Sequence, residues 1–146
     1  MRIRVAGLVE MDGCFALMHR KNVKKIENSS APYGEYYVFP GGGLEEDDST
    51  FEDGVKREIL EEFGINVNVK EKLCSRKVND DFEEHLFLCE YVSGKFGSGA
   101  GPEFSGDPKY IERGEYIPEI IPKEEFKKLR VLPQEFKDKI IEKFSI

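Results

Sequence analysis

Three segments of the chain are apolar at consecutive positions instead of at alternate ones. They are Ile3–Glu10, Cys14–Arg20 and His85–Val92. A strand with one solvated face alternates between apolar and polar residues, whereas a strand covered on both faces is apolar throughout. We therefore expect an α/β protein whose sheet is covered on both sides. Met11-Asp12-Gly13, between the first two segments, predicts a hairpin turn.

One helix in the middle of the chain has clear boundaries. Ser49-x-x-Glu52 forms a capping box that predicts a helix starting at Thr50, and Gly64 is a natural C-terminal cap. The other patterns predict a surface loop at Lys21–Gly34, strands at Tyr36–Phe39, Val67–Lys72 and Arg76–Val78, a structured glycine-rich loop at Gly94–Gly114, and helices at Lys123–Leu129 and Pro133–Phe144 with Pro133 at the first helical position.

Glu58, Glu61 and Glu62 crowd the last two turns of the bounded helix. Residues three and four apart are neighbours on a helix, so Glu58 faces both of the others, at a cost of a few tenths of a kcal/mol per pair. The negative pole of the helix dipole disfavours each anion by roughly 0.3–1 kcal/mol more. Local rules are broken in this way mainly at functional sites, and a bound divalent metal is the economical explanation.

The three glutamates fall within an arc of roughly 100° on the helix, beside its apolar face. Magnesium prefers oxygen ligands and usually takes one or two carboxylates together with phosphates and waters. Two ions could polarise a phosphoryl oxygen, activate a water and stabilise the leaving oxygen. Arg57 has Asp53 four residues before it and Glu61 four after it, so it could brace the carboxylates. A solvated acidic face is the alternative, against which the lack of interleaved lysines argues.

Length and charge restrict the class of protein. The 146 residues suffice for a single domain spanning 1–146, and the formal charge of −7 disfavours binding to a nucleic-acid polymer. No segment approaches membrane-spanning length, and the N-terminus lacks the apolar core of a signal peptide. Cys14, Cys74 and Cys89 form no CxxC pair and are expected to be reduced. We expect a cytoplasmic protein without a membrane partner.

The glycine triplet and the helix together resemble the signature of the Nudix hydrolases. That signature reads Gly, five residues, Glu, seven residues, then Arg-Glu-aliphatic-x-Glu-Glu-x-Gly-aliphatic, and REILEEFGI matches every defined position of its second half. Counting back from Arg57 makes Gly43 the leading glycine and puts Ser49 at the first glutamate position. Counting forward from Gly42 puts Asp48 there, with one residue too many. We take the first register, because it needs no insertion.

The resemblance implies an α/β/α sandwich around a mixed sheet. It also implies hydrolysis of a nucleoside diphosphate linked to another group, with Mg²⁺ or Mn²⁺ as the cofactor. By the same resemblance, Glu61 and Glu62 would be metal ligands, Glu58 a ligand or the base that activates water, and Arg57 a structural brace. The backbone of a loop glycine, which we take as Gly42, would add a ligand.

Some members of the family draw a further ligand or the base from a loop after the signature. The Gly94–Gly114 segment offers Glu103 for this role. Gly41 and Gly43 allow a phosphate to approach the backbone closely, and they are candidates for substrate binding. Arg20 begins a basic cluster near a strand end and could steer polyphosphate toward an acidic protein.

The leading hypothesis is a metal-dependent hydrolase that cleaves a pyrophosphate linkage in a small, nucleotide-like molecule by water attack. The alternative is a non-catalytic nucleotide-binding or regulatory domain of the same fold, motivated by Ser49 at the first glutamate position. A third hypothesis treats the helix only as an acidic surface for contact with a protein.

Overall fold

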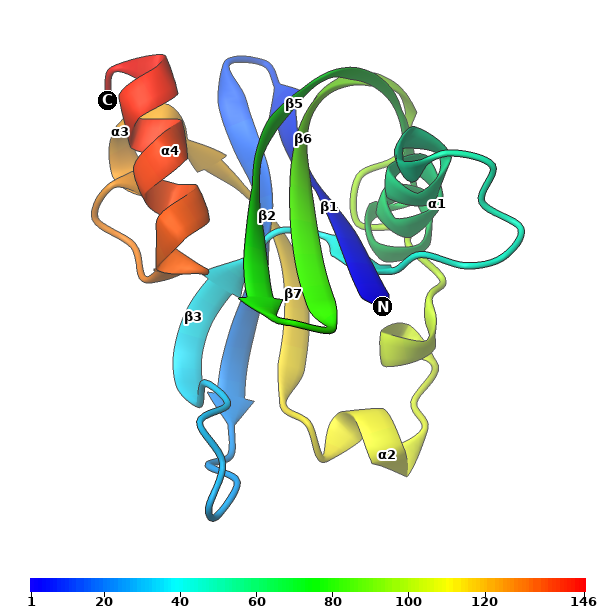
Figure 1. Cartoon of the computed structure of the whole chain (residues 1–146), viewed down its shortest axis with the longest axis vertical. Coiled ribbons are helices and arrows are strands. Elements are labelled where there is room, and N and C mark those ends of the chain that lie inside the picture. The colour runs from blue at the N-terminus through cyan, green and yellow to red at the C-terminus, as the bar shows by residue number, and fades with distance from the viewer.

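One mixed sheet runs through the molecule, with helices against both of its faces (Figure 1). The computed structural model describes residues 1–146. The strands are β1 (Arg2–Met11), β2 (Cys14–Val23), β3 (Gly34–Val38), β4 (Gly41–Gly43), β5 (Ile65–Asn79), β6 (Phe82–Gly94), β7 (Glu115–Pro122) and β8 (Val131–Leu132). The helices are α1 (Phe51–Phe63), α2 (Pro108–Ile111), α3 (Lys123–Phe126) and α4 (Gln134–Phe144), with a short 3₁₀ turn η1 (Pro102–Phe104).

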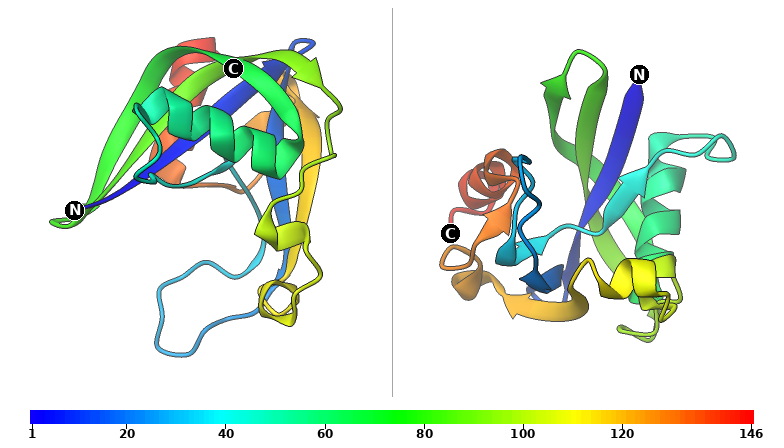
Figure 2. Two further views of the ribbon diagram at one scale, coloured as in Figure 1. Left: turned by 90° about the vertical axis from the view of Figure 1, so that its right-hand side faces the viewer. Right: turned by 90° about the horizontal axis from the view of Figure 1, so that it is seen from below.

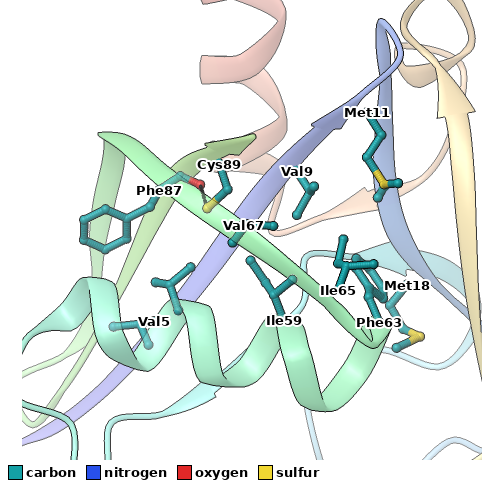
Figure 3. Packing of buried hydrophobic residues seen from close by; sticks show 12 residues of the cluster. Val5, Val9, Met11, Met18, Ile59, Phe63, Ile65, Val67, Phe87 and Cys89 are labelled. Atoms are coloured by element: carbon teal, nitrogen blue, oxygen red, sulfur yellow. Dashed lines mark hydrogen bonds between the residues drawn. The ribbon is translucent and has the colours of Figure 1, made fainter. Parts of the chain in front are cut away.

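Alternate residues of β1 enter two apolar clusters on opposite faces of the sheet. Val5 and Val9 pack in the cluster that contains Ile59 of α1 (Figure 3), whereas Ala6 and Leu8 belong to the cluster that contains the buried residues of α4. This arrangement confirms the expectation of a sheet covered on both faces, because a strand between two helical layers needs apolar side chains on both sides.

The strands β1 and β2 separate soon after their hairpin. They pair in register only from Val9 to Met11, next to the predicted turn at Asp12 and Gly13, where both residues have positive φ. Farther along, β1 pairs with β4 and with β6, while β2 pairs with β3 and β7. The sheet therefore follows the order β5-β6-β1-β2-β3-β8, with β4 and β7 as side branches.

The boundaries of α1 differ slightly from the sequence prediction. Thr50 is the N-cap, since its hydroxyl accepts a hydrogen bond from the backbone N–H of Asp53 at 3.1 Å, so the capping box at Ser49 was wrong by one residue. Gly64 caps the C-terminus as predicted, in the left-handed conformation (φ 75°). A hydroxyl accepting from the third residue of a helix works equally well from either position, so the local pattern left the start ambiguous.

Gly7 lets α1 lie unusually close to β1. A Cβ atom at this position would come within 2.6 Å of Ile59 Cδ1 and 3.1 Å of Val55 Cγ1, both in α1. A larger residue would push the helix away from the sheet, and with it the acidic face of the helix. Figure 2 shows α1 lying across the sheet at this point.

Several other elements correct the sequence predictions. The glycine triplet is strand β4, paired antiparallel with Arg4–Ala6, and β5 is one continuous strand because its pairing with β6 continues through the polar residues that separated the two predicted strands. β2 runs on to Val23, which shortens the predicted loop. β7 and β8 were not predicted, α3 ends at Phe126, and Pro133 is the N-cap of α4 instead of its first residue.

None of the helices is long and apolar enough to cross a membrane.

Candidate active site

Arg57 is the centre of a network that joins α1 to the loop before it. Its Nε and Nη2 donate to the two carboxylate oxygens of Asp48, at 3.0 and 2.8 Å, and its Nη1 donates to Glu58 Oε1 at 2.8 Å. A weaker bond reaches the carbonyl of Gly43 at 3.3 Å. The Asp48 side chain is only 5% exposed. Arg57 therefore braces the acidic helix, as predicted, but its main partner comes from the loop.

Asp48, and not Ser49, supplies the acidic side chain at the start of the motif. Ser49 is exposed, and Asp53, which we predicted as a bracing partner, does not pair with Arg57. The register that placed Ser49 at the first glutamate position was therefore wrong in its consequence. The extra residue between Asp48 and Arg57 is accommodated because the connection includes the turn and cap that precede α1.

The glycine strand holds two of the predicted glutamates against the backbone. Gly41 N–H donates to Glu62 Oε2 at 2.7 Å. A Cβ atom at Gly42 would lie 2.5 Å from Glu58 Oε1, so only glycine leaves room for that carboxylate, whose side chain is 13% exposed. Glu61 is more open, with 41% of its side chain exposed and its Oε2 3.6 Å from Arg57 Nη1.

The three glutamates form a strongly acidic group. Burial, together with the negative charges of Glu58 and Glu103, raises the pKa of Glu62 well above its usual range. Burial also raises the pKa of Glu58, against the opposing effect of Arg57 and with a contribution from Glu61. Such shifts mean that the carboxylates repel one another and lack sufficient positive charge nearby.

The loop after β6 folds back over the end of α1 and brings in Glu103. Gly97 N–H donates to the carbonyl of Phe63 and Gly101 N–H to that of Glu61, both at 2.9 Å, so the loop satisfies carbonyls that the helix end leaves free. The ring of Phe96 packs on Phe63, with centroids 5.0 Å apart. The loop is thus structured, as the sequence predicted, and its position follows from capping and from apolar packing.

Glu103 faces the acidic end of α1 from this loop. Its Oε1 is buried and has no hydrogen-bond partner, and burial and the charge of Glu61 raise the pKa of its carboxyl group. A buried oxygen without a donor is costly to leave unsatisfied. Such an atom is expected where a ligand completes its coordination.

The comparison with known families decides the assignment. The sequence matches the family model of the NUDIX domain over residues 1–136. The chain belongs to the Nudix hydrolase family. No curated protein sequence matches it.

Solved structures of Nudix proteins share its fold at low sequence identity. A MutT protein from Methanosarcina mazei Go1 is 22% identical, with a TM-score of 0.62 over 99% of this chain and 92% of that one. A MutT Nudix hydrolase from Burkholderia pseudomallei is 23% identical, with a TM-score of 0.57 over 83% and 82%. A Nudix hydrolase from Nitrosomonas europaea is 18% identical (TM-score 0.61). The match covers 88% of this chain but only 62% of that longer protein.

The acidic group of this Nudix chain suits a divalent cation in its chemistry. No three acidic, histidine or cysteine side chains are gathered closely enough to form a metal site on their own. Mg²⁺, however, needs only one or two protein carboxylates, with waters and substrate phosphates as its other ligands, and carboxylate and carbonyl oxygens also suit Mn²⁺. The unpartnered Glu103 Oε1 and the mutual repulsion of the glutamates are what such a cation would relieve.

Two arginines lie near the acidic group in the Nudix fold. Arg20, on β2, is held by the carbonyls of Glu115 and Arg113 at 3.1 and 2.6 Å, and its charge slightly lowers the pKa of Glu103. Arg4, on β1 opposite Gly43, has the same effect on Glu58 and Glu62. Sequence reasoning missed Arg4, although a charged residue at the start of an apolar strand was a usable signal.

Proposed function

We propose that this Nudix protein is a metal-dependent hydrolase that cleaves a pyrophosphate linkage in a small, nucleotide-like substrate by water attack. The observation that carries the proposal is the meeting of Glu58, Glu61 and Glu62 with Glu103 from a distant loop, in surroundings that raise the pKa of three of these carboxyl groups. Clustered carboxylates with perturbed pKa values are characteristic of functional sites.

Glu58, Glu61 and Glu62 would hold the metal, with the Gly42 backbone as a further ligand. When bound, Mg²⁺ or Mn²⁺ would polarise the phosphoryl oxygens and lower the pKa of a water molecule. The chain prepares these side chains for the role. Gly41 N–H fixes one oxygen of Glu62 and leaves the other free, and Arg57 orients Glu58 through Nη1.

Glu103 is the better candidate for the base that takes the proton of the attacking water. Glu58 Oε1 already accepts a hydrogen bond from Arg57, which weakens it as a base, whereas Glu103 Oε1 has no donor. The water oxygen would form a bond to one phosphorus while its proton passes to Glu103. The bridging oxygen would then leave on the second phosphate with the electrons of the broken bond.

Gly41, Gly43 and Arg20 remain the proposed contacts for the substrate. A side chain added at Gly43 would meet nothing within 4 Å, so this part of the strand is open to an approaching phosphate. Arg20 brings a positive charge toward the acidic group from the other branch of the sheet. Positive charge is needed here because a phosphoanhydride carries several negative charges toward a protein that is itself acidic.

The test combines a substrate screen with two matched variants. Compounds with a diphosphate linkage are incubated with the protein and Mg²⁺, and the products are identified. On the best substrate, Glu61→Gln and Glu62→Gln should each lower kcat/KM by at least about a hundredfold, because each removes a proposed metal ligand worth several kcal/mol in the transition state. Glu52→Gln, an exposed position on the same helix, should leave the rate unchanged.

Full activity in both site variants would show that the acidic end of α1 is not the catalytic centre. If the screen yields no product while calorimetry detects Mg²⁺-dependent nucleotide binding, the non-catalytic alternative is correct. The structure weakens the original motive for that alternative, because Asp48 occupies the place for which Ser49 was a poor substitute.

A further inference from the structure

A second charged region lies beside the proposed active site and has the opposite sign. A cavity of about 610 Å³ opens between the end of β2, the loop before β3, and α2. In Figure 1 this loop and α2 lie at the same end of the molecule. Four cationic side chains and a single carboxylate, that of Glu112, line the cavity; the cations are Arg20, Lys24, Lys109 and Arg113.

None of these four cations forms an ion pair with a carboxylate. Ion pairs of the molecule occur elsewhere, for example between Arg57 and Asp48 and between Lys123 and Glu10. In a chain of net charge −7, partners for four cations are plentiful. Gathering the cations without partners costs repulsive energy, and such an uncompensated feature marks a place where a ligand of opposite charge is expected.

A second cavity provides a contrast of equal size. It has the same volume, about 610 Å³, and also contains arginines, including Arg76. There, however, Arg76 pairs with Glu84 at 3.2 Å and with Glu135 at 3.0 Å. Its charges are compensated within the protein. The cavity beside α2 is the one with cationic side chains left free for an external anion.

The basic cavity and the acidic group are connected by one short segment. Glu103 lies in η1 and Lys109 in α2, six residues later, so the two are at most about 20 Å apart. Arg20 Nη2 ties this segment to β2 by donating to the carbonyl of Arg113 at 2.6 Å, and its guanidinium stacks on Tyr116 at 3.8 Å. An extended substrate could therefore reach both regions at once.

We propose that the cavity beside α2 binds a further phosphate group of the substrate, beyond the two phosphates joined by the cleaved bond. The inference rests on the proposed function for the position of those two phosphates. It deepens that function by selecting substrates with three or more phosphate groups in a chain, or with a separate phosphate at one end. Arginine and lysine side chains form charge-assisted hydrogen bonds with phosphate oxygens.

The first test measures binding without catalysis. Inorganic tripolyphosphate is titrated into the protein by calorimetry in buffer that contains a chelator, so that no metal recruits phosphate to the glutamates. The double variant Lys109→Gln/Arg113→Gln should bind tripolyphosphate roughly tenfold more weakly or worse than the wild type, because two charge-assisted contacts are lost. Both residues are exposed, and circular dichroism checks that the variant is folded.

Lys127→Gln is the matched control, since it removes one charge from an exposed lysine next to α3, away from both cavities. It should bind tripolyphosphate like the wild type. Equal affinity of the double variant and the wild type would overturn the inference. So would binding of a nucleoside triphosphate without binding of tripolyphosphate, because the cavity would then recognise the nucleoside.

The second test uses turnover in the presence of Mg²⁺. For a nucleoside triphosphate, the double variant should raise KM roughly tenfold or more with little change in kcat, while KM for the matching nucleoside diphosphate stays the same. An equal rise for both substrates would contradict the inference. If neither is hydrolysed but tripolyphosphate binding still depends on Lys109 and Arg113, the proposed function fails and the phosphate site stands.

Discussion

Replacing Asp48 with asparagine is expected to destabilise the fold by about 2–3 kcal/mol. Asp48 accepts two hydrogen bonds from Arg57, at 3.0 and 2.8 Å, and one from Glu45 N–H at 2.9 Å. Its side chain is 5% exposed and that of Arg57 is 22% exposed. Asparagine keeps the size of the side chain but removes its charge and turns an NH₂ group toward the arginine or the backbone donor.

The magnitude follows from what remains after the substitution. Losing one partner of a buried ion pair typically costs about 3–5 kcal/mol, because the other charge is left uncompensated. Arg57 keeps Glu58 and the Gly43 carbonyl as acceptors, so the loss falls below that range. In a chain of this size the change corresponds to a fall in Tm of roughly 4–12 °C.

The effect also has a definite dependence on pH. Hydrogen bonds from Arg57 lower the pKa of Asp48 below its usual 3.8. A carboxyl group whose pKa is lower in the folded state stabilises the fold above the unfolded pKa, and this contribution disappears as the pH falls through the folded value. The difference in unfolding free energy between wild type and Asp48→Asn should be full above about pH 5 and shrink below about pH 4.

Urea unfolding followed by far-ultraviolet circular dichroism measures this difference. Ser49→Ala is the control, because Ser49 is the neighbouring exposed residue and its loss should change stability by less than about 0.5 kcal/mol. The reasoning is refuted if Asp48→Asn is as stable as the wild type at neutral pH. It is equally refuted if Ser49→Ala is the more damaging change.

Two further predictions concern glycines. Gly42→Ala should abolish activity while leaving Tm nearly unchanged, because the added Cβ would displace the flexible Glu58 carboxylate 2.5 Å away, whereas Gly43→Ala meets open space and should be nearly neutral; an active Gly42→Ala enzyme would contradict this. Gly7→Ala should lower the free energy of unfolding by about 1–3 kcal/mol, since its Cβ would lie 2.6 Å from Ile59 Cδ1 in a packed core, and chemical denaturation would detect its absence.

The sequence by itself determined the elements that depend on local pattern. The consecutive apolar residues of β1, β2 and β6 predicted a sheet covered on both faces, and Gly64 fixed the end of α1. The three glutamates and Arg57 identified the family, because their spacing along one helix is a local property. The glycine triplet was recognised as important, but its pairing as strand β4 depends on β1, which lies far away in the sequence.

Only the tertiary structure decided which side chains meet. Asp48 pairs with Arg57 although a helical rule favoured Asp53, since the loop before α1 folds back over the helix. Glu103 reaches the glutamates because the backbone of its loop caps α1. The cationic cavity joins side chains of Arg20 and Arg113, more than ninety residues apart. Local periodicity reports which face of an element is buried, whereas contacts between distant segments follow from how the layers pack, and these contacts complete the site.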